Sequence, residues 1–430
     1  MGKNIIEING DNWEKEVVQS PVPVVVDFYS TECPPCEALA TKYESLAEIY
    51  GNDAKFVKIF RQQNKELAVS LGITGSPTVL FYKDGQKTGE QLAGGIRRKD
   101  LEKNIFDILP AGRGEVLKAN EKKSETEVDV AILGGGPTGL TAAIYAAQAK
   151  LNTLVIEQAV PGGNVNLTHM ISNYPGFIEP QPGFMLAHYF SEQAKSAGAH
   201  FKQSVDITSV DLHKKEIVLD GLETIKAKKI IIASGSSPRH LGIEGEKKYM
   251  GKGVSYCATC DAKYFEGKHA VVIGGGNSAV EEALFIAKFA SKITMVHQFD
   301  KFQANKLSAQ KLIDNPNVEI LYSHEPRAFI ASNSSVDKVK VENLKTKETY
   351  NIDCDGVFVF VGMEPNLHLF DHDHLEKDEW GYLMVDESMH TSIPDVFAAG
   401  DIIHKQYRQI TTAVADGTIA AIVAAKELDD

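Results

Sequence analysis

The five cysteines are the residues whose spacing most directly indicates chemistry. Four of them form two Cys-x-x-Cys pairs, Cys33/Cys36 and Cys257/Cys260, and Cys354 stands alone. Two cysteines three positions apart can cycle between a dithiol and a disulfide within one loop. An odd number of cysteines fits redox or metal chemistry better than a structural disulfide framework. We therefore expect two redox centres, with Cys354 as a structural residue.

The first pair stands between an expected strand over 22–29 and an expected helix over 37–50. The dipole at a helix N-terminus stabilises a thiolate, so we expect Cys33 to attack and Cys36 to resolve. Asp27 lies inside the apolar strand, where a buried carboxylate is costly unless it has a use. We expect it to accept the proton of Cys36; the alternative is a satisfied polar residue at a strand edge.

Two more residues are expected beside the sulfurs. Pro77 precedes an expected strand over 78–82, and a cis bond there would expose backbone to an incoming chain, although most X–Pro bonds are trans. Asp261 follows the second pair directly and can exchange a proton with the thiol released during disulfide exchange. A zinc half-site at Cys257 and Cys260 would need two more ligands, and none is near in sequence. We therefore expect no metal.

Two glycine-rich turns indicate two dinucleotide-binding units. The first turn follows an apolar strand over 128–133 and opens an Ala-rich helix. Its glycines permit a tight turn and close approach to a pyrophosphate, whose charge the helix N-terminus favours. Glu157, which ends the next strand, is placed to accept hydrogen bonds from a ribose. The expected contacts are Gly134, Gly136, Pro137, Thr138, Gly139 and Glu157.

The second turn follows an apolar strand over 270–273 and also opens a helix. His297 stands where the first unit has its acid. Two dinucleotide sites in one chain suit an enzyme that holds both FAD and a nicotinamide, and an inherited fold with an empty second site is the alternative. The expected nicotinamide-nucleotide contacts are Gly274, Gly276, Asn277, Ser278, Ala279, His297 and Gln298.

The composition argues against several classes of function. The chain has 430 residues and a formal net charge of −13, which repels nucleic-acid phosphates and anionic membranes. No stretch reaches the roughly 18 apolar residues of a membrane helix, and residues 1–16 lack the apolar core of a signal peptide. We therefore expect a cytoplasmic protein that binds neither nucleic acid nor membrane.

Several longer motifs identify a family. From about residue 128 to 428 the chain resembles bacterial low-molecular-weight thioredoxin reductases, and the first 107 residues resemble thioredoxin through Asp27, the Cys33/Cys36 pair and Pro77. The segments that carry the first resemblance are GGGPTG (134–139), NYPG (173–176), VSYCATCD (254–261), GGGNSAVEEA (274–283) and FAAGD (397–401).

The resemblance implies an α/β chain with an N-terminal thioredoxin fold and two Rossmann-like, doubly wound, three-layer domains. The thioredoxin-like domain is expected over 1–107, and a polar, charged linker over 108–127. The FAD-binding domain is expected over 128–240 and 372–430. It is interrupted over 241–371 by the NAD(P)H-binding domain that carries the CATC motif.

The resemblance also implies a homodimer. It implies two domain orientations, one that brings nicotinamide to flavin and one that exposes the dithiol to its partner. The start of an Ala-rich helix at 408–410 is expected to face the flavin with its N-terminus. The further expected FAD contacts are Gly163, Asn164, Asn173, Gly400, Asp401, Gln409 and Ile410.

Some positions depart from the family patterns. Glu32 replaces the usual Trp before the first cysteine, and Pro34-Pro35 replaces Gly-Pro between the cysteines. The arginines with which NADPH-using members grip the 2′-phosphate are missing from the run HQFDKFQ (297–303), and one flexible lysine is a poor substitute. Residues 302–312 resemble the NADH-using flavoprotein of alkyl hydroperoxide reductase. We therefore favour NADH over NADPH.

The leading hypothesis is a flavin-dependent disulfide reductase fused to its own thioredoxin. Electrons pass from NADH through FAD and Cys257/Cys260 to Cys33/Cys36 and on to protein disulfides. A reductase dedicated to a peroxiredoxin is one alternative, although that family has a larger extension built from two thioredoxin folds. A ferredoxin-fed reductase is a second, against which the intact turn at 274–279 counts. A docking module is a third, against which the complete cysteine pairs count.

Overall fold

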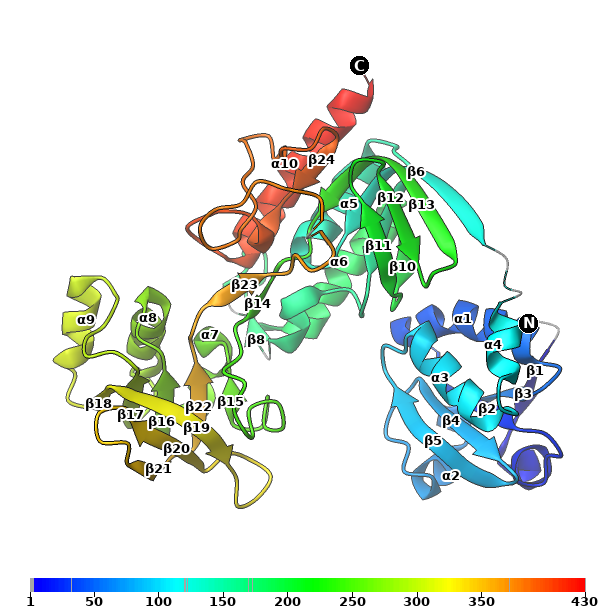
Figure 1. The fold of residues 1–430 in the computed structure, drawn as a ribbon, viewed down its shortest axis with the longest axis horizontal. Helices are drawn as coiled ribbons and strands as arrows, with labels where there is room; N and C mark the ends of the chain where they lie inside the picture. The colour runs from blue at the N-terminus through cyan, green and yellow to red at the C-terminus, as the bar shows by residue number, and fades with distance from the viewer. Residues whose placement is uncertain are drawn as a thin grey trace.

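The computed structural model describes residues 4–31, 33–119, 121, 123–168, 170–171, 173–370 and 372–429, and for Pro34, Leu167, Met170, Thr259 and Cys260 it describes the backbone only. Figure 1 shows an N-terminal unit in blue to cyan, called the thioredoxin domain below, followed by a unit built from cyan, green and orange-to-red segments, called the FAD domain. A nicotinamide domain, in green to orange, is inserted into the FAD domain. These names, taken from the resemblance, are kept below. The alternation of helices and strands along the chain confirms the expected α/β fold class.

The thioredoxin domain is a mixed sheet with helices packed on it. The strand order is β1-β3-β2-β4-β5, with β1, β3 and β2 parallel and β4 and β5 antiparallel. The first five residues of β2 are buried, because this strand lies at the centre of the sheet. The strands are β1 (Ile5–Ile8), β2 (Val24–Tyr29), β3 (Lys55–Phe60), β4 (Thr78–Lys83) and β5 (Gln86–Ala93). The helices are α1 (Pro34–Tyr50), α2 (Lys65–Ser70), α3 (Arg98–Ile108) and α4 (Arg113–Lys118).

The linker expected over 108–127 is structured for much of its length. Residues 113–118 form α4, and β6 begins at Ser124. Leu117 packs against the thioredoxin core, and the buried Arg98 side chain forms ion pairs with Glu102 and Glu121. A polar composition therefore did not mean an extended chain, because one leucine and paired charges suffice to anchor a short helix.

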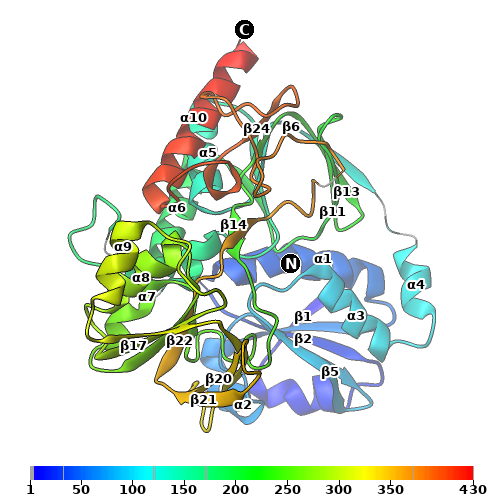
Figure 2. The same ribbon diagram turned by 60° about the vertical axis from the view of Figure 1, so that its left-hand side comes forward.

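The FAD domain is a sheet with a layer of helices packed on it. Its strand order is β10-β7-β6-β13-β12-β11, and β24 adds to β13 in parallel. The strands are β6 (Ser124–Leu133), β7 (Thr153–Glu157), β10 (His200–Gln203), β11 (Ile207–Asp211), β12 (Glu216–Leu219), β13 (Glu223–Ile232) and β24 (Val396–Ala398). The helices are α5 (Pro137–Gln148), α6 (Gly183–Ala197) and α10 (Ile410–Asp429). Helix α5 packs against both α6 and α10, and Figure 2 shows the three helices close together. The C-terminal strand β24 and helix α10 thus complete the domain that began with β6.

The nicotinamide domain repeats this plan. Its parallel strand order is β15-β22-β16-β17-β18, and an antiparallel sheet β19-β20-β21 lies beside it. The strands are β15 (Val254–Ser255), β16 (His269–Ile273), β17 (Lys292–His297), β18 (Val318–Tyr322), β19 (His324–Ile330), β20 (Lys338–Asn343), β21 (Thr349–Asp353) and β22 (Gly356–Val359). The helices are α7 (Ala258–Asp261), α8 (Asn277–Ile286) and α9 (Lys306–Ile313).

Two short antiparallel strands, β14 (Ser236–Pro238) and β23 (Met363–Pro365), carry the chain into and out of the nicotinamide domain. Because only these two strands make the crossing, they are the natural place for one domain to turn against the other. Within the described part of the chain, no helix is long and apolar enough to cross a membrane.

Candidate active site

A cavity of about 770 Å³ opens at the carboxyl ends of β6 and β7, where ligands bind in open α/β sheets. Its walls come from the FAD domain, the segment that follows β23, and the cysteine loop of the nicotinamide domain. Eleven of the thirteen FAD contacts expected from the sequence line it. They are Gly134, Gly136, Pro137, Thr138, Glu157, Gly163, Asn164, Asn173, Asp401, Gln409 and Ile410.

The other two expected contacts, Gly139 and Gly400, shape the cavity from behind. A Cβ at Gly139 would overlap the carbonyl oxygen of Gly134, so only glycine lets α5 pack this closely on the turn. Gly400 has φ +84°, and a Cβ there would overlap the side chain of Thr138. Both glycines support the site by allowing close approach of neighbouring segments, which is the usual role of the third fingerprint glycine, here Gly139.

Glu157 is held by backbone donors at the end of β7. Its Oε2 accepts a hydrogen bond of 2.7 Å from Gly135 N–H, and its Oε1 accepts one of 2.8 Å from Ala159 N–H. A carboxylate has about four lone-pair sites, so both oxygens keep capacity for the hydroxyls of a ribose. Glu157 is therefore oriented in advance for the role expected from its position.

Asp401 is the most unusual carboxylate of the cavity. Burial raises its pKa, while Lys405 and Arg408 act in the opposite direction. Its buried Oδ1 has no hydrogen-bond partner among the described residues, and Lys405 Nζ lies 3.5 Å away. A buried polar atom left unpaired is costly. A ligand that donates a hydrogen bond here would remove that cost.

These observations fit FAD. The glycine turn and the N-terminus of α5 can bind a pyrophosphate. Glu157 can accept hydrogen bonds from a ribose, and Asp401 can accept one from a donor group of the ligand. Asn173 Nδ2 donates to Gln409 Oε1 over 3.3 Å across the mouth of the cavity, beside the start of α10. Asn164 is fixed by a 2.8 Å bond from its Nδ2 to the carbonyl oxygen of Ser236.

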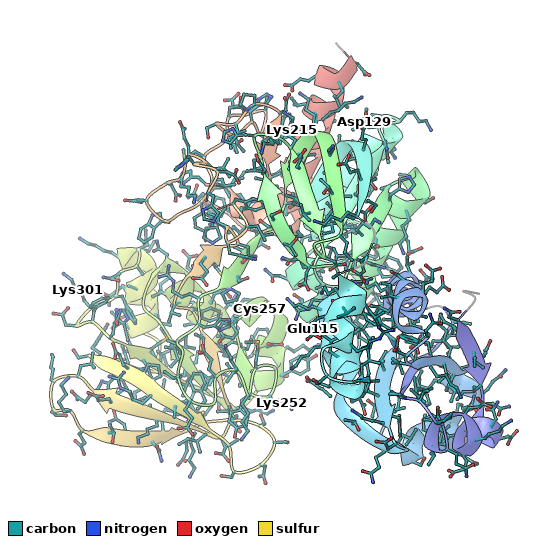
Figure 3. All side chains as sticks on the ribbon, turned by 45° about the vertical axis from the view of Figure 1, so that its right-hand side comes forward. Glu115, Asp129, Lys215, Lys252, Cys257 and Lys301 are labelled. Carbon is teal, nitrogen blue, oxygen red and sulfur yellow. A yellow bond between two sulfur atoms is a disulfide. The ribbon has the colours of Figure 1, made fainter. Side chains whose placement is uncertain are left out.

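Cys257 lies on the cavity wall beside the FAD fingerprint residues. It is the N-cap of α7, and Figure 3 places it on the side of the nicotinamide domain that faces the rest of the molecule. The side chain of Cys260 lies outside the described residues. The structure thus brings one expected redox sulfur to the expected flavin site, although more than a hundred residues separate the two motifs.

Asp261 is linked to Cys257 through a serine. Ser255 Oγ donates a 2.6 Å hydrogen bond to Asp261 Oδ2, and the same Oγ accepts one of 3.2 Å from Cys257 N–H. The carboxylate is therefore held at the cysteine loop. The sequence analysis did not single out Ser255, because a serine two positions before a cysteine carries no recognisable spacing signal.

The second glycine turn lies away from the flavin cavity. The buried ring of His297 packs against Gly275, where a Cβ would overlap it, and burial lowers its pKa. Gln298 is exposed next to it. Asn277 Oδ1 accepts a 2.7 Å bond from Asn305 N–H, which fixes the N-terminus of α8. Of the expected nicotinamide contacts, His297 therefore supports the turn from below.

The exposed end of this site carries few cations. Gln298, Phe299 and Asp300 are consecutive and all exposed, and Lys301 lies at the outer edge of the domain in Figure 3. Gln303 pairs with the glycine turn through its backbone, which donates 2.8 Å to the carbonyl oxygen of Gly275.

The other cysteine pair forms a disulfide, with 5.2 Å between the Cα atoms of Cys33 and Cys36. Cys33 is the N-cap of α1, and its Sγ accepts a 3.3 Å hydrogen bond from Cys36 N–H. Cys33 is half-buried, whereas Cys36 is 8% exposed. The more accessible sulfur is thus the one at the helix end, as the assignment of the attacking cysteine requires. Glu32 lies outside the described residues.

Asp27 and Pro77 belong to neighbouring elements of this centre. The bond between Ser76 and Pro77 is cis, and the carbonyl oxygen of Ser76 lies 3.5 Å from Cys33 Sγ. Asp27 is 2% exposed, and its Oδ1 has no hydrogen-bond partner among the described residues. Burial raises the pKa of Asp27 to about 7, with the charge of Lys58 acting in the opposite direction. Such a carboxyl can both give and take a proton near neutral pH.

Cys354 is 9% exposed, and burial raises the pKa of its thiol to about 12. A thiol that stays protonated is a poor nucleophile.

The cavity also contains residues that the sequence analysis missed, among them Phe285, Asn366 and His368. Asn366 ties the crossing strands together, because its Nδ2 donates 2.8 Å to the carbonyl oxygen of Ser234 and its Oδ1 accepts 2.8 Å from Ser237. Asn366 and His368 lie on a segment without a motif, and Phe285 lies two residues beyond the GGGNSAVEEA motif, so only the fold brings them to the cavity.

Comparison with known proteins covers both parts of the chain. A family described as pyridine nucleotide-disulphide oxidoreductase matches residues 128–417, and thioredoxin matches residues 4–107. A 34.2 kDa protein in the rubredoxin operon of Clostridium pasteurianum is 46% identical over 305 residues, which are 71% of this chain and 98% of that protein. The thioredoxin reductase of Treponema pallidum is 39% identical over 306 residues, with the same shares.

A solved structure agrees with these relatives. The thioredoxin reductase of Streptococcus pyogenes MGAS5005 matches with a TM-score of 0.61 at 36% identity, covering 70% of this chain and 98% of that one. The family implies FAD and a pyridine nucleotide, for which this chain has a fitting cavity and a second glycine turn. The chain is therefore a member of the thioredoxin reductase family in which a thioredoxin domain with its own Cys-x-x-Cys pair precedes the reductase.

Proposed function

We propose that this enzyme uses NADH to reduce Cys257 and Cys260, passes the electrons to Cys33 and Cys36, and then reduces disulfides of other proteins. The observation that carries the proposal is the position of Cys257 on the wall of the cavity that contains the FAD fingerprint residues. When bound there, FAD supplies the two-electron exchange between a nicotinamide and the cysteine pair. The residues of the chain bind that cofactor and move the protons.

Reduction of the Cys257–Cys260 disulfide takes two electrons and two protons. Asp261, held by Ser255, is the acid that would protonate the released thiolate and take the proton back when the dithiol reacts. A thiolate of this pair then attacks Cys33 Sγ, which breaks the Cys33–Cys36 bond and forms a mixed disulfide. The second thiol resolves that bond and leaves both N-terminal cysteines reduced.

The N-terminal pair is arranged for the reverse exchange with an outside disulfide. Cys33 attacks because it is the more accessible sulfur and lies at a helix N-terminus. Cys36, which is buried, resolves the mixed disulfide. Asp27 would carry the proton of Cys36, since its raised pKa keeps it partly protonated near neutral pH. The peptide bond before Pro77 presents backbone next to Cys33, where an incoming chain would lie.

The preference for NADH rests on what surrounds the second glycine turn. A 2′-phosphate needs planar, charged donors, and the exposed positions after β17 offer Gln298, Phe299 and Asp300. A ribose 2′-hydroxyl can be bound by neutral hydrogen-bonding groups alone, and Gln298 has such a group.

An apolar face on the FAD domain supports the expected homodimer. Tyr145 on α5, Phe184 and Tyr189 on α6, and Ile419 and Ile422 on α10 are all more than a third exposed. Helix α5 packs against both α6 and α10, so these exposed apolar residues lie on neighbouring helices. Such surfaces commonly mark contacts between subunits.

Anaerobic stopped-flow absorbance tests the electron route. The FAD-loaded protein is mixed with NADH or NADPH, and the flavin band is followed together with the thiols of each cysteine pair. We expect rapid bleaching with NADH, slow bleaching with NADPH, and reduction of Cys33–Cys36 only after the flavin. Faster bleaching with NADPH would reject the coenzyme assignment, and N-terminal cysteines that stay oxidised beside reduced flavin would reject the route.

A further inference from the structure

A buried lysine of the thioredoxin domain is bonded to the FAD domain. Lys42, in the middle of α1, is 9% exposed. Its Nζ donates to three carbonyl oxygens, that of Ile96 at 3.3 Å, Gln203 at 2.9 Å and Ser204 at 2.5 Å. An ammonium group has three N–H donors, so all of them are used. Two of the three acceptors belong to the FAD domain, and the lysine is satisfied only while the domains are in contact.

Two more cations surround this contact. Lys99 Nζ lies 2.8 Å and Arg97 Nη1 lies 3.5 Å from Asp206 Oδ1, across the boundary between the domains. The carboxylate of Asp220 accepts a 2.9 Å hydrogen bond from Asp206 N–H, which fixes the acidic turn. A cationic face of one domain therefore meets carbonyl and carboxylate oxygens of the other.

The acceptor segment has the geometry of a built site. Ser204 has φ 54°, a region that residues other than glycine seldom adopt. Its N–H donates 3.0 Å to the carbonyl oxygen of Ala159, whose own N–H is bonded to Glu157. The strained turn is thus supported from the cofactor side, and it directs two successive carbonyl groups at one ammonium ion.

The thioredoxin side of the contact lies next to its redox centre. A Cβ at Gly95 would lie 3.3 Å from Val160 Cγ2, so the glycine allows the two backbones to approach. The preceding Gly94 donates 3.1 Å from its N–H to the carbonyl oxygen of Pro77. The contact therefore borders the surface around Cys33 without covering it, since Cys33 remains half-buried. Figures 1 and 2 both show α1 on the side that faces the FAD domain.

The contact is mainly polar. Among the described residues, none of the hydrophobic clusters contains side chains from both domains. Interfaces of this kind allow domains to separate and rejoin, and charges near the surface make the equilibrium sensitive to salt.

We propose that residues 203–206 of the FAD domain are a docking site for the thioredoxin domain of the same chain, which they recognise through Lys42, Arg97 and Lys99. The dock holds the thioredoxin domain on the FAD domain while Cys257 lines the flavin cavity. It limits the positions that a tethered domain can take, which the connecting segment alone does not do. A thioredoxin without the three cations would not be retained there.

Small-angle scattering of the full-length, FAD-loaded protein tests the dock, with the radius of gyration compared at equal oligomeric state. Lys42→Met removes the three hydrogen bonds of the ammonium group, and Asp206→Asn removes the negative charge that faces Arg97 and Lys99. We expect each change to lower the ratio of docked to free domain by roughly tenfold and to raise the radius of gyration. High salt should do the same to the wild type.

Lys228→Met is the matched control, because Lys228 pairs with Asp129 at 2.8 Å within the FAD domain. It should leave the radius of gyration unchanged. Lys99→Met, at an exposed position, gives a second test that does not risk the fold, and flavin content with circular dichroism reports whether Lys42→Met has folded. A radius that stays the same in the Lys99 and Asp206 variants, or that rises equally in the control, would overturn the proposal.

Discussion

Asp27 on β2 and Lys58 on β3 are direct register partners in the parallel ladder of the thioredoxin domain, yet they form no close ion pair. Burial raises the pKa of the carboxyl to about 7, and the charge of Lys58 acts in the opposite direction. The native state therefore holds a proton that the unfolded chain has released above its ordinary pKa of 3.8.

The stability of the thioredoxin domain should fall as the pH rises from about 4 to about 7, and level off above that. The native state binds more protons than the unfolded state in this window, so the free energy of unfolding decreases with pH, by a total on the order of 4 kcal/mol. Asp27→Asn should remove this slope, whereas Asp84→Asn, at an exposed turn, should keep it. Urea unfolding followed through the buried Trp13 measures it, and a slope that persists in Asp27→Asn would contradict the assignment.

Cys36→Ser should trap a covalent complex with a disulfide substrate. Cys33 can still attack, but the mixed disulfide is no longer resolved from the buried position. Cys33→Ser should form no such complex and should lose nearly all NADH-driven insulin reduction. Mass spectrometry and insulin turbidity give the two readouts, and undiminished insulin reduction by Cys33→Ser would show that the N-terminal pair is not on the route.

Asp261→Asn should slow electron transfer out of the reduced flavin by about a hundredfold, the usual contribution of a positioned acid. The amide still bonds to Ser255 but cannot protonate a thiolate. Rapid-mixing absorbance of the flavin band measures the rate. Asp353→Asn, an exposed acid of the same domain, is the control, and equal effects of both changes would remove Asp261 from the mechanism.

Replacing Gln298 and Gln303 together by arginine should raise kcat/KM for NADPH by roughly tenfold to a hundredfold. Two guanidinium groups would offer a 2′-phosphate charged hydrogen bonds that the present side chains lack. Steady-state kinetics with both coenzymes reports the change. Gln310→Arg adds one such charge at an exposed position of α9 and should leave the coenzyme preference as it is.

Gly139→Ala should yield protein with little bound FAD. The added methyl group would collide with the carbonyl oxygen of Gly134 and push α5 off the phosphate-binding turn. Gly75→Ala is the matched change, since a Cβ there meets nothing within 4 Å. The ratio of flavin to protein absorbance after purification decides the outcome, and full flavin content in Gly139→Ala would refute the packing argument.

The sequence by itself determined the local chemistry, because each signal is confined to a few neighbouring residues. Spacing identified the cysteine pairs, and a strand, a glycine turn and an acid in register predicted Glu157 and its cavity. Strands and helices such as β2 and α1 followed from runs of apolar residues. The absence of arginine from residues 297–303 predicted the coenzyme, which remains a prediction.

Only the tertiary structure decided which distant segments meet. It placed Cys257 and Asn366 in one cavity with the glycine turn, anchored α4 in the expected linker, and seated Lys42 on the carbonyl groups of 203 and 204. A lysine on a helix and two backbone carbonyl groups far along the chain have no pattern of their own. Their contact exists because two folded domains present them to each other, and pairing within one stretch of sequence cannot encode it.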